Sequence, residues 1–377
     1  MIGRPSEPAV LQIDDKRARY FAIATLAILL GFAVYKSLAL YGVFQVPNPD
    51  FPGFVQVGKR LLKFKVPSTF KRLPMIGLMQ VLLSKVMPGD QPVLTAGWVI
   101  NAVFSALSVV LLWRVGKRII GDSAIWVAIL AMLNPWVLRS QVNPIAETSM
   151  IFFTLLTFVF MFRNSWWVYL FACFASMVRY ECAALIPIAF IMDMIKRKGL
   201  KQRLLAVLWA ALASVPMGLW MLGTRIAWQQ PGAKRAYIGD FTGSSHLGIR
   251  YVETLWDTTF KYMLQLPAAA KAMFVRTTSA EAVSVTDSMN ALFTVVKVIT
   301  AIAFIAAVVW GLYRRKWNFL ALLLFFGIYV GIHAARKATH QRYCVPVIWL
   351  AILLCAYGLK GVWRIINIKN WMPKMVV

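Results

Sequence analysis

Three carboxylates stand out because each lies at the end of an apolar stretch, where an ionisable group is costly unless it faces a cavity. Asp50 lies in the segment NPDFPG, Glu147 in NPIAET and Glu181 in RYE. Two carboxylates that share a cavity can supply a general base and can bind a metal ion or orient an acceptor. Simpler interpretations remain open, since Glu147 could cap a helix and Glu181 could be a structural partner of Arg179.

A second group of residues could hold an anion. Arg179 lies between two short apolar stretches, and Arg342 opens the last one, in the segment RKATHQRY. A planar guanidinium matches the oxygens of a phosphate, so a phosphate at membrane depth would account for both arginines. Side chains that snorkel toward lipid headgroups explain Arg336 and Lys337 equally well. His340 is interpreted as a membrane-interface side chain, because the three histidines make no metal-binding pattern.

The elements that would position these residues are membrane spans. The chain is 60% hydrophobic and only 15% charged, with a mean hydropathy of +0.67. Soluble domains carry about 25% charged residues, so the composition excludes an ordinary soluble globule, a disordered chain and a nucleic-acid-binding domain. The net charge of +27 is therefore assigned to membrane lipids rather than to nucleic acid. The four cysteines form no C-x-x-C pair and are interpreted as small buried side chains.

Apolar runs predict an all-α polytopic membrane protein with about ten transmembrane helices, since a span needs about 20 apolar residues and fewer inside a bundle. The fifth and sixth spans are short, so the turn that joins them would lie below the membrane surface. The first is expected to be an uncleaved anchor, because its N-terminal region is long and contains acidic residues. The predicted spans are residues 20–42, 92–113, 119–138, 148–163, 165–178, 182–195, 204–225, 291–313, 317–334 and 343–363.

Basic clusters in the short loops predict the orientation. They precede the first span and follow the second, sixth, eighth and tenth. The excess of Lys and Arg in cytoplasmic loops therefore places these loops and both termini inside the cell. We expect a multi-pass protein of the plasma membrane, the inner membrane in a bacterium, with Asp50, Glu147 and Glu181 on the outer side.

Two long outer segments remain. Residues 43–91 contain two stretches, 51–64 and 70–87, that are interpreted as amphipathic helices lying in the interface plane. Residues 226–290 form a second outer loop with short helices. We therefore divide the chain into an N-terminal transmembrane module (1–225), this outer loop (226–290), and C-terminal transmembrane helices with a basic cytoplasmic tail (291–377).

The pattern resembles the GT-C glycosyltransferases, in the branch of protein mannosyltransferases and aminoarabinose transferases. The resemblance covers most of residues 20–195 and then 333–358. It rests on the order and shared sidedness of short motifs, each of them weak by itself. They are Asp50 after the first span, Arg72-Leu73-Pro74 opening the second juxtamembrane helix, Asn143-Pro144 before Glu147, Arg179-Tyr180-Glu181 in a short hairpin, and Arg342-Tyr343 with Pro346 opening a late span.

The resemblance implies a GT-C-like fold and transfer of a sugar from a polyprenyl-phosphate carrier on the outer face. It implies that Asp50 is the catalytic base and Glu147 the second acid, with a Mg²⁺ or Mn²⁺ ion, if one binds, held by these two. It implies a site for the donor phosphate at Arg179 and Arg342, to which Lys85 and His340 would add positive charge. Glu181, Tyr343 and Arg72 would support the site.

The sequence departs from the family pattern in specific places. Asp50 is followed by Phe51 instead of a second acid, which weakens the case for a metal in this loop. The second acidic position is Glu147 rather than an aspartate. The chain is short, so recognition of a glycan, lipid or protein acceptor would fall to the 226–290 loop and the juxtamembrane helices.

The reaction that this implies is attack of an acceptor hydroxyl on the anomeric carbon. Asp50 would take the proton, a single displacement would invert the anomeric centre, and the two arginines would stabilise charge on the departing phosphate. Other interpretations remain open: an O-antigen ligase or polymerase-like enzyme with a diphosphate donor, a lipid or sugar transporter, and a non-catalytic subunit of a membrane complex. The sequence shows no inverted repeats of the kind that many transporters carry.

Overall fold

The computed structural model describes residues 15–39, 49–67, 70–228, 247–256, 290–335 and 341–371, and within these ranges all regular structure is helical. The main helices are α1 (Asp15–Ala39), α2 (Phe51–Leu62), α3 (Pro74–Leu83), α4 (Pro92–Ile120), α5 (Ala124–Met132), α6 (Pro135–Val142), α7 (Ala146–Phe162), α8 (Trp167–Val178), α9 (Leu185–Lys196), α10 (Leu200–Trp228), α11 (Leu247–Trp256), α14 (Asn290–Tyr313), α15 (Trp317–Ala334), α16 (Gln341–Cys344) and α17 (Ile348–Trp371). Short 3-10 turns join several of them: η1 (Ser84–Val86), η2 (Gly121–Ser123), η3 (Tyr180–Ala184) and η6 (Val345–Val347).

Long apolar helices identify the chain as an integral multi-pass membrane protein. Five helical segments of the described part are long and apolar enough to cross a bilayer, by length and composition: Pro92–Met132, Leu200–Ile226, Val295–Tyr313, Trp317–Ala334 and Val345–Trp363. Shorter apolar helices include Ala146–Phe162 and Trp167–Val178. The prediction of a polytopic helical protein is therefore confirmed in this coarser form.

The third predicted span, 119–138, was drawn wrongly. Gly121 has a φ of 72°, a left-handed value that favours glycine, and it ends α4. The chain then folds back, so that Gly116 of α4 lies against Ala124 of α5. A second break follows at Asn134, whose side chain caps α6 by accepting a hydrogen bond from the Trp136 amide at 3.0 Å. The apolar pattern alone could not reveal these two breaks.

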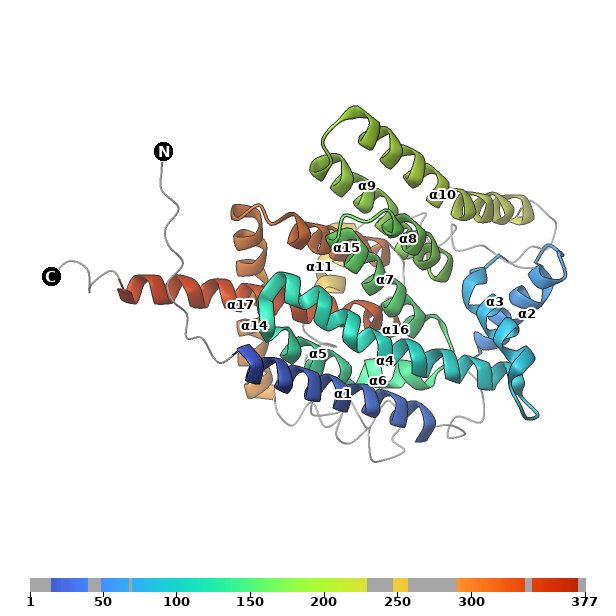
Figure 1. Ribbon diagram of the computed structural model, residues 1–377, viewed down its shortest axis with the longest axis horizontal. Coiled ribbons are helices and arrows are strands. Elements are labelled where there is room, and N and C mark those ends of the chain that lie inside the picture. Colours follow the sequence, from blue (N-terminus) through green and yellow to red (C-terminus); the bar gives the residue numbers. More distant parts are fainter. Residues whose placement is uncertain are drawn as a thin grey trace.

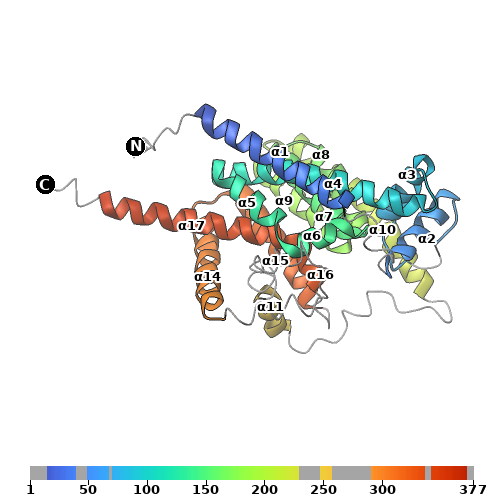
Figure 2. The same ribbon diagram turned by 90° about the horizontal axis from the view of Figure 1, so that it is seen from below.

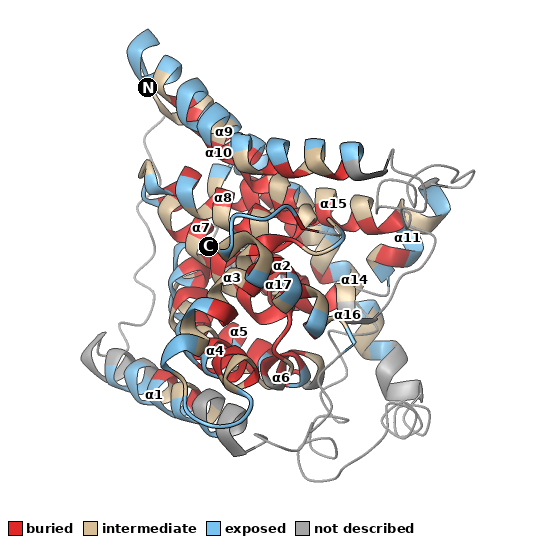
Figure 3. Ribbon diagram, turned by 90° about the vertical axis from the view of Figure 1, so that its right-hand side faces the viewer, coloured by how far each residue is buried: buried red, intermediate tan, exposed pale blue. Residues whose placement is uncertain are grey.

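The core lies where α7 passes between α4, α8 and α17. The side chains of Phe158, Phe325 and Trp349 are almost fully buried and meet edge to face, with ring centroids 5.7–6.3 Å apart. Figure 3 shows the buried residues concentrated in these central helices, whereas α1, α10 and α14 keep long exposed faces. Such exposed apolar faces suit helices that meet lipid rather than water.

The basic clusters gather at one end of the molecule. Lys196 donates to the Asn318 side chain at 2.7 Å, Arg197 to the Asn164 carbonyl at 2.8 Å, and Lys360 to the Ile120 carbonyl at 2.5 Å. These bonds join the end of α9 to the first turn of α15 and to the loop after α7, and the middle of α17 to the end of α4. The start of α1 and the last turns of α17 lie at the same end, while α2 and α3 lie at the other (Figures 1 and 2). The grouping of the short basic loops on one side thus matches the prediction.

The two juxtamembrane stretches form α2 and α3, which cross at very close range. Gly58 and Gly77 lie at the crossing, and a Cβ atom on either would overlap the backbone of the other helix. Helix α2 is amphipathic and buries Phe54 and Val57. Helix α3 starts at Pro74 rather than at residue 70 and is apolar apart from one glutamine, so the prediction of amphipathic character was wrong for this second helix.

Candidate functional site

A buried ionic cluster occupies the end of the bundle that carries α2 and α3. The Arg179 guanidinium donates from Nη1 to Glu147 Oε1 at 3.1 Å, and from Nη2 and Nε to the two carboxylate oxygens of Glu181 at 3.1 and 3.3 Å. Arg179 is 9% exposed, Glu181 5% and Glu147 1%. Charge-assisted bonds of this kind are strong because little water competes for them.

Local backbone structure explains how these three residues meet. Helix α8 ends at Val178, and Arg179 adopts an extended conformation (φ −147°, ψ 139°) that turns its side chain out of the helical path. The next residues form η3, which carries Glu181, and Glu147 lies in the first turn of α7. The start of α7 and the turn after α8 thereby bring the three residues together.

The electrostatics of the cluster favour the charged form of Glu181. Burial by itself raises the pKa of Glu181, but the neighbouring Arg179 guanidinium and His333 outweigh burial and lower this pKa to about 2. Glu181 therefore remains a carboxylate throughout the physiological range. The observed bidentate contact agrees with the interpretation of Glu181 as a structural partner of Arg179.

His333 and Tyr343 complete the cluster on its far side. His333 Nε2 lies 3.3 Å from Glu181 Oε1, and the imidazole stacks on the Tyr343 ring with centroids 5.0 Å apart. The Arg179 guanidinium lies over the same Tyr343 ring, 5.2 Å from its centroid. The Tyr329 hydroxyl donates to the Tyr343 carbonyl at 2.6 Å, which fixes the start of the last helical segment against α15.

His333 was missed by the sequence analysis, which chose His340 instead. His333 is 3% exposed in the last turn of α15, and the signal for it was available. A titratable side chain inside an otherwise apolar span is a candidate functional residue by its position alone.

Asp50 and Arg72 form a second ion pair at this end of the molecule. The pair is partly exposed, with side-chain exposures of 22% and 16%. Asp50 also starts α2, where its carbonyl accepts the Phe54 amide, and the Arg72 guanidinium lies over the Phe54 ring, 5.6 Å from its centroid. The sequence singled out both residues, and the structure brings them into contact.

A hydrogen-bonded bridge joins the two ionic groups. The Tyr180 hydroxyl donates to the Phe70 carbonyl at 2.8 Å, and the Trp220 indole of α10 donates to that carbonyl and to the hydroxyl at 3.2 and 3.1 Å. Tyr180 follows Arg179 directly, and Phe70 lies two residues before Arg72. The segment that pairs with Asp50 is therefore fastened to the hairpin that carries Arg179.

The remaining predicted site residues are placed less closely. Lys85 lies in η1, where its side chain is exposed. Arg342 lies in α16, and its side chain is outside what the structure describes, as are Arg336, Lys337 and His340.

Metal ligation by Asp50 and Glu147 does not fit this arrangement. Each carboxylate faces a guanidinium, Arg72 for Asp50 and Arg179 for Glu147. Among the residues that the structure describes, no three His, Cys, Asp or Glu side chains converge as a cation site. These two carboxylates are therefore arranged to bind guanidinium groups rather than a metal ion.

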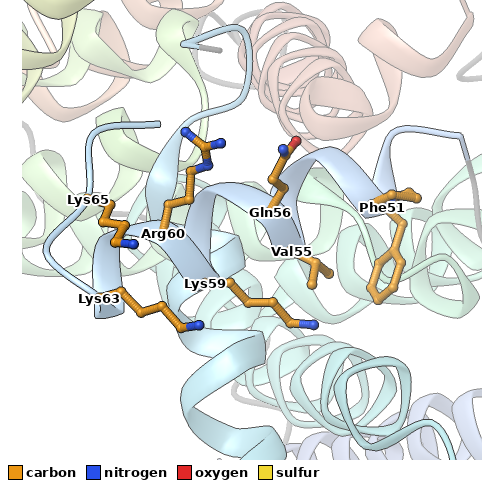
Figure 4. Close-up of a pocket in the computed structure, with 8 residues that line it drawn as sticks. Phe51, Val55, Gln56, Lys59, Arg60, Lys63 and Lys65 are labelled. Atoms are coloured by element: carbon orange, nitrogen blue, oxygen red, sulfur yellow. The ribbon is translucent and has the colours of Figure 1, made fainter. Parts of the chain in front are cut away.

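A surface groove follows α2. It has a volume of about 680 Å³, with Phe51, Pro52 and Val55 at one end. Figure 4 shows Lys59, Lys63 and Lys65 toward the other end. An apolar wall with a cationic far end suits a ligand that is part apolar and part anionic.

No family model matches the sequence, and no curated protein matches it either. Solved structures do: the apo oligosaccharyltransferase of Archaeoglobus fulgidus matches with a TM-score of 0.53 and 11% identity over 95% of this chain. The same enzyme, AglB, in complex with an inhibitory peptide and a dolichol-phosphate, matches with a TM-score of 0.53 and 12% identity over 95% of the chain. The form tethered to an acceptor peptide containing the NVT sequon gives 0.52 and 11% over 94%. This chain spans about half of the oligosaccharyltransferase, 52% of its length in the apo form. The fold thus resembles the GT-C fold of the membrane region of this oligosaccharyltransferase.

Proposed function

We propose that this protein is a membrane glycosyltransferase that moves a sugar from a polyprenyl-phosphate carrier to an acceptor hydroxyl on the outer face of the membrane. The observation that carries the proposal is the meeting of Asp50–Arg72 and Glu147–Arg179–Glu181 at one end of a fold shared with an oligosaccharyltransferase. The dolichol-phosphate bound by that enzyme supports a lipid-linked donor here.

Asp50 is the proposed general base. A base must be within reach of the acceptor, and Asp50 holds its carboxyl group at a partly exposed position beside the Arg72 guanidinium. The proton of the attacking hydroxyl passes to Asp50 as its oxygen bonds to the anomeric carbon.

Arg179 is proposed to stabilise the departing phosphate, together with Arg342, Lys85 and His340. Two carboxylates already engage Nε and one N–H each of Nη1 and Nη2 of Arg179. Its remaining N–H groups can bind a phosphate oxygen, while Glu147 and Glu181 hold the guanidinium plane. Glu147 then acts as a positioning residue rather than as a second base, and Tyr343 supports the plane from one face.

The test uses the full chain in lipid vesicles with a panel of polyprenyl-phosphate sugars, and measures release of polyprenyl phosphate. We expect Asp50→Asn to lower turnover by about 100-fold or more, the usual contribution of a general base, with donor binding retained. Asp90→Asn, which neutralises an exposed acid in the loop before α4, is the matched control and should keep wild-type turnover.

A further variant separates catalysis from structure. Arg72→Gln breaks the same ion pair but keeps the carboxylate, so it should cost much less activity than Asp50→Asn. Equal losses would mean that the pair is only structural, and near-normal turnover of Asp50→Asn would refute the base assignment. Consumption of a diphosphate-linked glycan with no use of monophosphate donors would favour the ligase interpretation instead.

A further inference from the structure

A second pocket lies at the opposite, basic end of the bundle, away from the candidate site. It has a volume of about 460 Å³ and lies between the C-terminal ends of α4 and α7. Its lining consists of Arg114, Lys117, Arg118 and Arg163, with Val159 and Phe162. Four cations from two helices thus share one cavity with two buried apolar side chains.

Three of the four cations of this pocket, all except Lys117, differ from the other basic residues nearby. Arg197 is paired with Asp193 and stacked on Trp166, and Lys360 is bonded to a carbonyl. Lys117 pairs with Asp122 at 2.9 Å. Within the described part of the chain, by contrast, Arg114, Arg118 and Arg163 form no ion pair. Three guanidiniums are therefore held close together without an anion to balance them.

The two helices that form the pocket run in parallel. Their starts meet at the candidate-site end, where Gly97 of α4 lies against the Pro144 side chain just before α7. Their middles meet where Phe104 stacks on Phe152 at 4.2 Å. Their far ends meet at the pocket. A continuous seam therefore leads from the middle of the bundle to the cations.

An exposed apolar stripe leads along this seam to the pocket. Val103 and Leu107 are 48% and 44% exposed, and helical spacing places them on the same face of α4 as Arg114 and Arg118. On α7, Phe152, Leu156 and Phe160 are partly buried and recur at helical spacing ahead of Arg163. The surface thus matches an amphiphile, with an apolar track of about 16 Å on α4 ending in a cationic pocket.

We propose that this groove is a binding site for an anionic phospholipid. Its phosphate lies among Arg114, Arg118 and Arg163, and an acyl chain follows Val103 and Leu107 along α4. Guanidinium groups match phosphate oxygens, and basic pockets between membrane helices are known to hold anionic headgroups. The apolar track favours a lipid over a soluble anion. The site lies at the other end of the bundle from the proposed sugar transfer and does not depend on it.

The test measures binding of phosphatidylglycerol to the full-length protein in detergent by native mass spectrometry, with phosphatidylcholine as the uncharged comparison. We expect Arg114→Gln with Arg163→Gln to weaken phosphatidylglycerol binding about 30-fold, at about fivefold per cation. The control, Lys198→Gln with Lys201→Gln, removes the same charge from exposed positions in the turn after α9 and the first turn of α10, and should change binding less than about twofold.

A charge-conserving variant and a competition experiment distinguish a lipid-phosphate site from other causes of phosphatidylglycerol binding. Arg114→Lys with Arg163→Lys keeps both charges, and should retain binding within about threefold if the site is a phosphate site; this variant also covers the case in which the glutamine pair fails to fold. An equal loss in the control variant would mean diffuse attraction to any anionic surface and would overturn the proposal. Competition by inorganic phosphate at the lipid's own concentration would show a soluble-anion site and would also overturn it.

Discussion

The buried cluster around Arg179 gives a prediction whose size can be worked out. Arg179→Gln leaves Glu147 and Glu181 buried beside each other without their cation. Breaking a buried ion pair by removing one partner costs about 3–5 kcal/mol. At about 2 °C per kcal/mol for a large domain, the midpoint of thermal unfolding should fall by roughly 6–10 °C.

The assay can use the protein's own cysteines. Cys173, Cys182, Cys344 and Cys355 are free and buried, so a thiol-reactive fluorophore labels them only as the bundle opens. Cys182 is next to Glu181 in η3 and is fully buried, which makes it a local reporter. Heating the protein in detergent with this reagent gives the unfolding midpoint directly.

A neutral version of the cluster provides the control. Arg179→Met combined with Glu147→Gln and Glu181→Gln removes all three charges, and neutral groups of similar size often replace buried ions at little cost. We expect this triple variant to unfold at a higher temperature than Arg179→Gln alone. If Arg179→Gln unfolds at the wild-type temperature, the carboxylates are not desolvated in the way the structure implies, and the reasoning fails.

Three further predictions concern packing, pH and coupling. Gly77→Ala should force α2 and α3 apart and lower the unfolding midpoint, whereas Gly218→Ala on α10, with open space around it, should be neutral or stabilise by up to about 1 kcal/mol; thiol labelling compares the two. Because the pKa of folded Glu181 is depressed to about 2, the stability that this carboxylate contributes is complete above the unfolded pKa of about 4.5 and is lost as the pH falls toward 2. The unfolding midpoint of Glu181→Gln should therefore fall less steeply in acid than that of the wild type. An equally steep fall in both would contradict this prediction. Tyr180→Phe removes the hydroxyl that bridges Phe70 and Trp220. It should lower the free energy of unfolding by about 1–3 kcal/mol and should also lower turnover, as unfolding and transfer assays in parallel would measure. Unchanged values in both assays would show that the bridge is dispensable.

Much of the candidate site was visible in the sequence because charged residues are rare in an apolar chain. Glu147, Arg179 and Glu181 were each singled out by lying at span ends, and all three meet in one cluster. Their pairing could not be foreseen, since it depends on the extended backbone at Arg179 and on how α7 and α8 are rotated against each other. The same holds for Asp50 and Arg72, which are 22 residues apart.

The helix pattern was predictable only in outline. Hydropathy reports that a stretch is apolar, and it averages over a single turn that reverses the chain. The breaks at Gly121 and Asn134 depend on one backbone angle and one side-chain cap, so they lie below the resolution of such averages. Helix α3 was misjudged for a related reason: it is buried against α2, α4 and α8, and a helix covered on several sides has no polar face to reveal it.

The ionic cluster also constrains how relatives of this chain can diverge. A change at Glu147, Arg179 or Glu181 alone leaves a buried charge without its counterpart, so single steps are penalised while joint replacements are tolerated. These positions should therefore be inherited as a set, all ionic or all neutral. An alignment of related sequences would then show correlated substitution between the start of α7 and the turn after α8. Few of these sequences would combine ionic and neutral residues at the three positions.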